Sequence, residues 1–294
     1  MASDLTTADA DELAGALRER RPRKIRLRPS LVIGACLVLA SLLLAVLGPM
    51  IAPDAASRVN FSAILRPPLI GWHVAGTDQL GRDVLMRIAT GLRVSFAISL
   101  SSVTLALVVG LSVGLISGYF GGIIDLVLMR LTDIQMALPF IVLAVAILSV
   151  TQPGYFSLTV VLSLAAWPTY ARVVRGIVQV DRNADYVQAA LAIGASHTRV
   201  IVRYLLRDLF GSMLVLSILD VAAVIIYEAT LTFIGMGVPP GTPSLGSIMA
   251  EGKNYIATAW WITAMAGLAM LITIAGLNLV AIALRSSLKE ANTR

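Results

Sequence analysis

An all-helical integral membrane protein is the fold class that this sequence predicts, and three observations predict it. Apolar side chains make up 57% of the 294 residues and charged ones 14%, and the mean hydropathy is +0.85. Soluble domains contain about 25% charged residues. The apolar residues gather in six runs, each near the length of about 20 residues that crosses a bilayer as a helix. The charged residues cluster near the ends of these runs.

The net charge and the cysteine and histidine content argue against several other classes of function. The net charge of +6 comes largely from basic residues beside the apolar runs, which indicates membrane orientation rather than nucleic-acid binding. Cys36 is the single cysteine, so an intramolecular disulfide is impossible and a thiol metal site is not expected. His73 and His197 fall in very different regions, so the sequence predicts no histidine metal cluster.

The first predicted span, residues 31–52, follows a strongly basic segment. The basic residues before it are Arg18, Arg20, Arg21, Arg23, Lys24, Arg26 and Arg28. By the positive-inside rule they place residues 1–30 in the cytoplasm as a basic tail. A cleaved signal peptide would have a shorter apolar core and a small-residue cleavage site, so we expect an uncleaved transmembrane anchor.

The five further spans are expected at residues 92–117, 123–150, 156–174, 209–237 and 260–284. The third of the six is interrupted early by charges and later by Pro139, so its first part is expected at the membrane interface. Within that part, Arg130 and Asp133 have the spacing of a local ion pair on a helix.

Six spans that start in the cytoplasm return the C-terminus to the cytoplasm. Residues 53–91 then form an extracytoplasmic loop, residues 92–285 a core with a cytoplasmic hairpin at 183–208, and residues 286–294 a cytoplasmic tail. The arginines between residues 172 and 208 agree with this topology. The external loop also contains arginines, but its length weakens the rule there.

The hairpin is predicted to consist of two short helices that meet at a tight corner. Asp185 is placed to cap the first helix, with Gln188 three residues later as in a capping box. Gly194 supplies a stop in the left-handed region, and Ser196 can cap the second helix.

The two hairpin helices differ in the surfaces that they present. The first carries side chains small enough for close approach to another surface, at Ala189, Ala190 and Ala192. The second carries a basic stripe formed by Arg199, Arg203 and Arg207. Beside that stripe runs an apolar one, formed by Val200, Ile201, Tyr204 and Leu205. Two interpretations are open: the hairpin lies on lipid headgroups, or it docks on a protein.

The stretch "AALAIGAS" resembles the EAA loop of ATP-binding-cassette (ABC) importer permeases, in which Glu-Ala-Ala is followed three residues later by Gly. Ala189, Ala190 and Gly194 match this pattern, whereas Gln188 stands at the usual Glu and Arg207 where Pro is frequent. The resemblance implies that this loop is a coupling helix that sits in a groove of an ATPase subunit. The coupling residues that we predict are Gln188, Ala189, Ala190, Gly194, Ala195, Arg199 and Arg203.

Four more stretches are similar to the C-type membrane subunit of dipeptide and oligopeptide importers. They are "GTDQLGRDVLMR", "GYFGGIIDLVLMRLTDIQMALP", "WPTYARVVRG" and "EATLTFIGMGVPPGTPSLGSIMAEGKNY". The resemblance implies the type I ABC importer permease fold in a bacterial inner membrane. It also implies as partners a B-type permease, two ATP-binding subunits or domains and an extracytoplasmic solute-binding protein, within membrane lipid. The substrate by default is a di- or oligopeptide, with a nickel chelate or glutathione as alternatives.

No phosphate-binding loop of the form GxxxxGK[ST] is present in the sequence. The nearest candidate, residues 246–254, has five residues between its glycines and an asparagine after its lysine. ATP and magnesium are therefore expected on partner subunits, and we predict no catalytic residue and no cofactor in this chain.

Two acids, Asp220 and Glu228, interrupt the fifth span and can share one helix face because they are eight residues apart. They either line a translocation route and favour a cationic group, or they pair with polar groups of a neighbouring helix. A secondary transporter in which these acids bind ions is the main rival function, and a membrane scaffold is a second. The external motif "GTDQLGRD" is interpreted as a self-satisfied loop, with docking of the solute-binding protein as its functional alternative.

Overall fold

The computed structural model describes residues 29–71, 73–152 and 154–292, and the basic tail predicted at residues 1–30 lies almost wholly outside them. Within these residues the chain is helical apart from its connections. The long helices are α2 (Pro29–Ile51), α3 (Val84–Phe120), α6 (Tyr155–Asp181), α9 (Leu206–Phe233) and α11 (Trp261–Asn292). The shorter ones are η1 (Phe61–Ala63), α4 (Gly122–Ala137), α5 (Phe140–Val150), α7 (Asp185–Ala192), α8 (His197–Val200), η2 (Ile201–Leu205), α10 (Leu245–Gly252) and η3 (Lys253–Tyr255).

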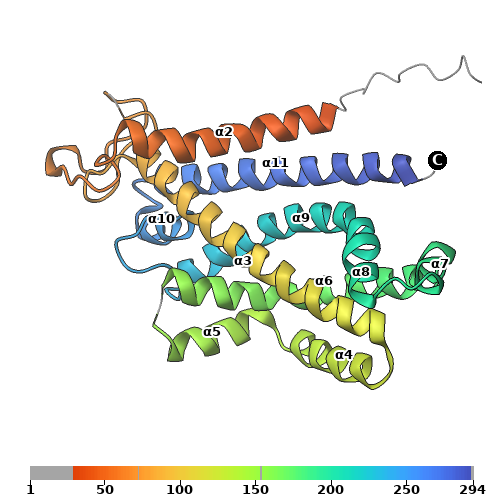
Figure 1. Cartoon of the computed structure of the whole chain (residues 1–294). Coiled ribbons are helices and arrows are strands. Elements are labelled where there is room, and N and C mark those ends of the chain that lie inside the picture. The colour runs from red at the N-terminus through yellow and green to blue at the C-terminus, as the bar shows by residue number, and fades with distance from the viewer. Residues whose placement is uncertain (1–28, 72, 153, 293–294) are drawn as a thin grey trace, which may run out of the picture.

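Five helices of the described chain are long and apolar enough to cross a membrane, and a bent pair makes a sixth crossing if it counts as one span. The pair is α4 and α5, which meet at 88° across Leu138 and Pro139. The predicted all-helical membrane fold is thus confirmed, and so is the interruption at Pro139. Figure 1 shows α4 and α5 as two separate segments beside α6.

The second span begins earlier than hydropathy indicates. Its helix, α3, starts at residue 84 because the carboxylate of Asp83 caps it, accepting a hydrogen bond from the backbone N–H of Met86 at 3.0 Å. It then runs for 37 residues and packs along α6. Gly110 and Gly114 allow this close packing, because a Cβ on either would come within 2.6 Å of a backbone oxygen of α6.

The first span, α2, lies beside the last, α11, at the edge of the molecule (Figure 1). Gly34 permits the contact, because a Cβ there would come within 2.9 Å of the carbonyl oxygen of Gly276. The start of α2 and the end of α11 lie on the same side as α7 and α8 (Figure 1). We refer to that side as the hairpin end, and to the side that contains residues 52–83 and α10 as the loop end.

Candidate functional site

The corner of the hairpin forms as the sequence predicts. Gly194 has φ +87°, and the N–H groups of Gly194 and Ala195 donate to the carbonyls of Leu191 and Ala190, both at 3.0 Å. This pair of bonds is a Schellman motif, which needs a residue in the left-handed region after the helix. The hydroxyl of Ser196 then accepts from the N–H of Arg199 at 3.3 Å, which confirms the second cap.

The predicted capping box at the start of α7 is wrong. Ala184 occupies the N-cap position, and no side chain caps this helix. Asp185 is already the first helical residue, so its carboxylate is not in position to accept from the N–H groups that follow. Gln188 instead donates from Nε2 to the carbonyl of Arg182 at 2.8 Å and so joins α7 to the end of α6.

The hairpin presents an exposed tip and a buried inner face. Ile193, just before the corner, is 87% exposed, and Ala189 and Ala192 are also exposed. Ala190 is buried, so it packs inside the hairpin, contrary to the expectation that it lies on the outer surface. The basic stripe is exposed as predicted, at Arg199, Arg203 and Arg207.

The second hairpin helix continues directly into the fifth span. Residues 197–233 form one helix 37 residues long, which confirms that Arg207 allows a connection without a proline break. Within it, residues 201–205 form a π-helical turn, in which the N–H of Leu206 donates to the carbonyl of Ile201.

Polar contacts tie the hairpin to the ends of α3 and α6. The guanidinium of Arg182 donates to the carbonyls of Gly118 and Tyr119, at 2.9 and 3.1 Å. The hydroxyl of Tyr119 lies 2.5 Å from Nδ1 of His197, the first residue of α8. On the outer side, the hydroxyl of Tyr186 donates to Asp208 at 3.0 Å. Neither hydropathy nor residue spacing predicts these contacts between helices.

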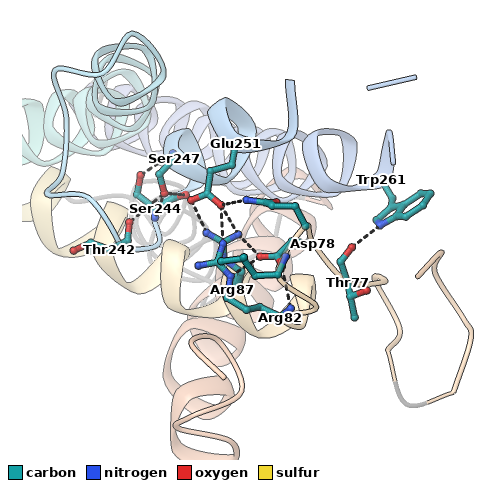
Figure 2. Close-up of polar contacts among 11 residues, drawn as sticks. Thr77, Asp78, Arg82, Arg87, Thr242, Ser244, Ser247, Glu251 and Trp261 are labelled. Carbon is teal, nitrogen blue, oxygen red and sulfur yellow. Dashed lines mark hydrogen bonds and ion pairs between the residues drawn. The ribbon is translucent and has the colours of Figure 1, made fainter. Parts of the chain in front are cut away.

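A second polar cluster lies at the loop end and is shown in Figure 2. The buried carboxylate of Asp78 accepts from Arg82 Nε and Arg87 Nη1, each at 2.6 Å. Both arginines also reach Glu251 of α10: Arg82 Nη2 and Arg87 Nη1 donate to its Oε2 at 2.8 Å, and Arg87 Nη2 donates to its Oε1 at 2.8 Å (Figure 2). We name Asp78, Arg82, Arg87 and Glu251 the ionic cluster.

The ionic cluster joins two segments that lie far apart in the sequence. The N–H of the Trp261 indole donates to the carbonyl of Thr77 at 3.1 Å and adds a third attachment to the same loop (Figure 2). Burial alone would raise the pKa of Glu251. The hydrogen bond and charge of Arg87, together with Gln79 and Arg82, lower this pKa by more, so the net pKa falls below its usual range. The motif around Asp78 is therefore bonded within itself, as interpreted, and also to α10.

The two acids of the fifth span have different surroundings. Glu228 is fully buried and accepts from the hydroxyls of Ser95 and Thr232 at 2.8 and 2.9 Å, so in this chain it joins α9 to α3. Asp220 is half-buried, and its Oδ2 has no hydrogen-bond partner among the described residues.

The local ion pair predicted within the interrupted span does not form. Asp133 instead accepts from Arg172 of α6 at 2.6 Å, and Asp125 pairs with Arg175 of the same helix. Both acids of α4 form ion pairs with arginines of α6, because α4 packs against α6.

Residues 110–290 match the family described as binding-protein-dependent transport system inner membrane component, which is more than half of the chain. The chain belongs to this family. It is therefore a multi-pass permease subunit of an ABC importer, and the family's permeases are not catalytic because the ATPase is a separate subunit.

Several curated permeases are similar over most of their length. The chain is 33% identical over 264 residues to the dipeptide transport system permease protein DppC of Haemophilus influenzae, covering 87% of this chain and 89% of that one. It is 37% identical over 266 residues to a putative peptide transport system permease protein of Brucella suis, covering 90% and 89%. It is 32% identical over 257 residues to the oligopeptide transport system permease protein OppC of Bacillus subtilis, covering 87% and 84%.

A solved structure shares the fold of this permease. A chain of the MetNI methionine ABC transporter, in an inward-facing conformation, superimposes with a TM-score of 0.51 at 21% identity, covering 67% of this chain and 95% of that one. This similarity confirms the type I importer permease fold that the sequence predicts.

Proposed function

We propose that this permease subunit moves di- or oligopeptides across a bacterial inner membrane by alternating access, with energy received through the α7–α8 hairpin. The observation that best supports this proposal is the exposure of the hairpin tip. Ile193 at the tip is apolar and 87% exposed, although the base of the hairpin is bonded to α3 and α6. An exposed apolar tip on a corner that is bonded to the spans suits insertion into a groove of another protein. The names of the relatives, which are peptide permeases, support the substrate class.

The proposed assembly contains a B-type permease, two ATP-binding subunits or domains and an extracytoplasmic solute-binding protein. The hairpin end, with both termini, would face the cytoplasm, and the loop end would face the solute-binding protein. The exposed arginines of the hairpin and the basic residues before α2 support this orientation. ATP and magnesium would be bound by the partners alone.

In the proposed mechanism, ATP binding draws the two ATPases together and the hairpin transmits that movement to the spans. Two routes leave the hairpin. One passes through the continuous helix of residues 197–233, and the other passes through Arg182 and Tyr119 to α3. Gln188, Ala189 and Ala195 would contact the ATPase at the corner, with Arg199 and Arg203 beside them.

Asp220 is the stronger of the two proposed pathway residues, because its Oδ2 is buried in this structure without a partner among the described residues and is therefore free to bind another group, whereas Glu228 is bonded within this subunit. An Asp220 that faces the pathway would favour a cationic group such as a peptide amino terminus. Asp220→Asn should then reduce the uptake of cationic peptides more than that of neutral ones, and equal effects would assign Asp220 to packing.

Coupling through the hairpin is tested by substitutions at its corner and by a control substitution at an exposed position just before it. Ala190→Glu places a charge inside the hairpin and Gly194→Pro disrupts the Schellman motif, so both should abolish ATP-dependent peptide uptake while the spans still insert. The matched control, Val180→Glu, adds the same charge where the side chain is 72% exposed, just before the hairpin. Full ATP-dependent uptake by both hairpin variants would overturn the proposal.

Purification of the assembled complex distinguishes the rival functions. Gentle solubilisation of the tagged wild-type chain should recover a second permease, ATPase subunits and a solute-binding protein, and mass spectrometry of the latter's ligand would distinguish a peptide from a nickel chelate or glutathione. Recovery of this chain alone, with uptake that survives ATP depletion, would favour an ion-coupled secondary transporter and a hairpin that rests on lipid.

A further inference from the structure

The break between α4 and α5 forms one wall of a pocket. Its volume is about 240 Å³. The residues that line it are Gln135, Met136, Leu138 and Phe140 at the break, and Leu164, Ala165 and Pro168 on α6. Leu164 to Pro168 occupy the middle of the 27-residue α6, so the pocket lies near the mid-depth of the spans.

At this break the last carbonyls of α4 and the first N–H groups of α5 lack partners within a regular helix, although the carbonyl of Pro139 accepts from the N–H of Leu143 at 3.1 Å. Leu138 and Pro139 interrupt the helix, no side chain caps the start of α5, and proline has no N–H to donate. At membrane depth, such backbone is tolerated only where protein buries it or where it lines a water-filled cavity. Met136 and Leu138 are each 49% exposed, so this chain does not bury the break by itself.

One side chain at the pocket can form hydrogen bonds. Gln135 Nε2 lies 3.4 Å from the carbonyl oxygen of Leu164, which is the carbonyl that Pro168, four residues later, leaves without its helical donor. Oε1 of Gln135 accepts no hydrogen bond among the residues that the structure describes, and the side chain is only half-buried. The pocket therefore offers a neutral acceptor beside apolar walls.

We propose that this pocket is half of a site in the translocation path that holds the main chain of a peptide, whose amide N–H donates to Gln135 Oε1. The proposal rests on the proposed function and names a position for the substrate. No charged residue lines the pocket, which suits the neutral main chain rather than a terminus. Met136 and Phe140 are apolar, and the flexible methionine accommodates side chains of different shape.

The size of the pocket indicates that a second chain completes the site. Small-molecule sites usually measure about 300–1,000 Å³, which is more than the 240 Å³ found here. The exposed residues of the break would then face the second permease subunit across the path, which would enclose the other half of the peptide.

Cysteine accessibility in the assembled complex tests whether water reaches the break. Because Cys36 is the only cysteine, Cys36→Ser gives a background without thiols. In this background, Leu138→Cys is compared with Leu271→Cys. The native Leu271 lies on α11, is 63% exposed and does not line the pocket. A membrane-impermeant thiosulfonate should modify Leu138→Cys at least tenfold faster than Leu271→Cys. Equal rates would overturn the proposal, whether or not the complex transports peptides.

Transport by Gln135→Leu tests the role of the amide. The variant should lower peptide uptake about tenfold, because one hydrogen bond to the substrate is lost. Stimulation of ATP hydrolysis by the loaded solute-binding protein should persist, since the hairpin is unchanged. The control is Asn278→Leu, which removes an amide that donates to its own helix at Ile274. Uptake by Gln135→Leu equal to that of the control would overturn the substrate contact, whereas failure of the proposed function itself would abolish ATP-dependent uptake by the wild type.

Discussion

The two ends of α3 are held in contrasting ways. At the loop end, Arg87 and Asp78 are 2% and 0% exposed, and each makes more than one charged hydrogen bond within the ionic cluster. At the hairpin end, Tyr119 bonds to His197 and the carbonyls of Gly118 and Tyr119 accept from Arg182, but Tyr119 is only half-buried and His197 is exposed. One helix thus joins an end held by a buried cluster of charges to an end held by fewer and more exposed hydrogen bonds.

This contrast separates the tasks of the two ends. A buried ion pair contributes little net stability, but removal of one partner is costly, so it strongly opposes any change of its geometry. Sparse, exposed hydrogen bonds allow local opening at low cost. We therefore expect the loop end to keep its structure while the hairpin end adjusts to a partner.

The largest effect is expected from Arg87→Met, which removes the most buried cation of the ionic cluster and leaves Asp78 and Glu251 with Arg82 alone. Removal of one partner from a buried pair costs about 3–5 kcal/mol, so the free energy of unfolding should fall by that amount. Thermal and denaturant unfolding of the purified complex measures it. Arg58→Met, at an exposed loop position, is the control and should change the unfolding free energy by less than about 0.5 kcal/mol. A loss for Arg87→Met as small as that of the control would remove the contrast between the ends.

A smaller effect is expected at the hairpin from Gly194→Ala. The φ of +87° is unfavourable for alanine by about 1–2 kcal/mol, so amides of α7 and α8 should exchange with deuterium roughly tenfold faster. Gly176→Ala on α6 is the matched control, because a Cβ there meets nothing within 4 Å and the residue is exposed. Faster exchange that spreads to the loop end would show that the two ends open together.

The smallest effects are expected from pH, and they separate the two ends. The pKa of Glu251 is lowered, so its stabilising effect is complete above the ordinary value of 4.5 and is lost as the pH falls from there through the lower folded value. Burial, with the bond to Asp208, raises the pKa of Tyr186 to about 12, so its contribution is complete below 10.0 and is lost as the pH rises toward 12. Acid should therefore increase hydrogen exchange first at α10, and alkali first at the hairpin. The opposite order would contradict both assignments.

The sequence predicted those features that depend on local spacing. Long apolar runs located the spans, Pro139 indicated the interruption of the third, and Gly194 with Ser196 predicted the corner, because a left-handed glycine and a serine cap act within a few residues.

Contacts over long sequence distances could not be predicted in this way. Glu251 lies 164 residues from Arg87, and hydropathy carries no information about which charges meet after folding. The same limit explains the error at Asp133, which had a local partner at suitable spacing but pairs with Arg172 across helices. Helix spacing also could not show whether the face of Glu228 points to a path or to α3.

The π turn at residues 201–205 determines how the hairpin is rotated about the helix axis relative to the fifth span. Each residue of an α-helix advances the chain by about 100° around the axis. Deletion of one residue from this turn, to restore a regular helix, would swing the exposed tip at Ile193 to a different bearing while the spans stayed in place. A chimera that exchanges hairpins between permeases should therefore carry the π turn with the hairpin, because a junction inside it would misalign two correctly folded halves.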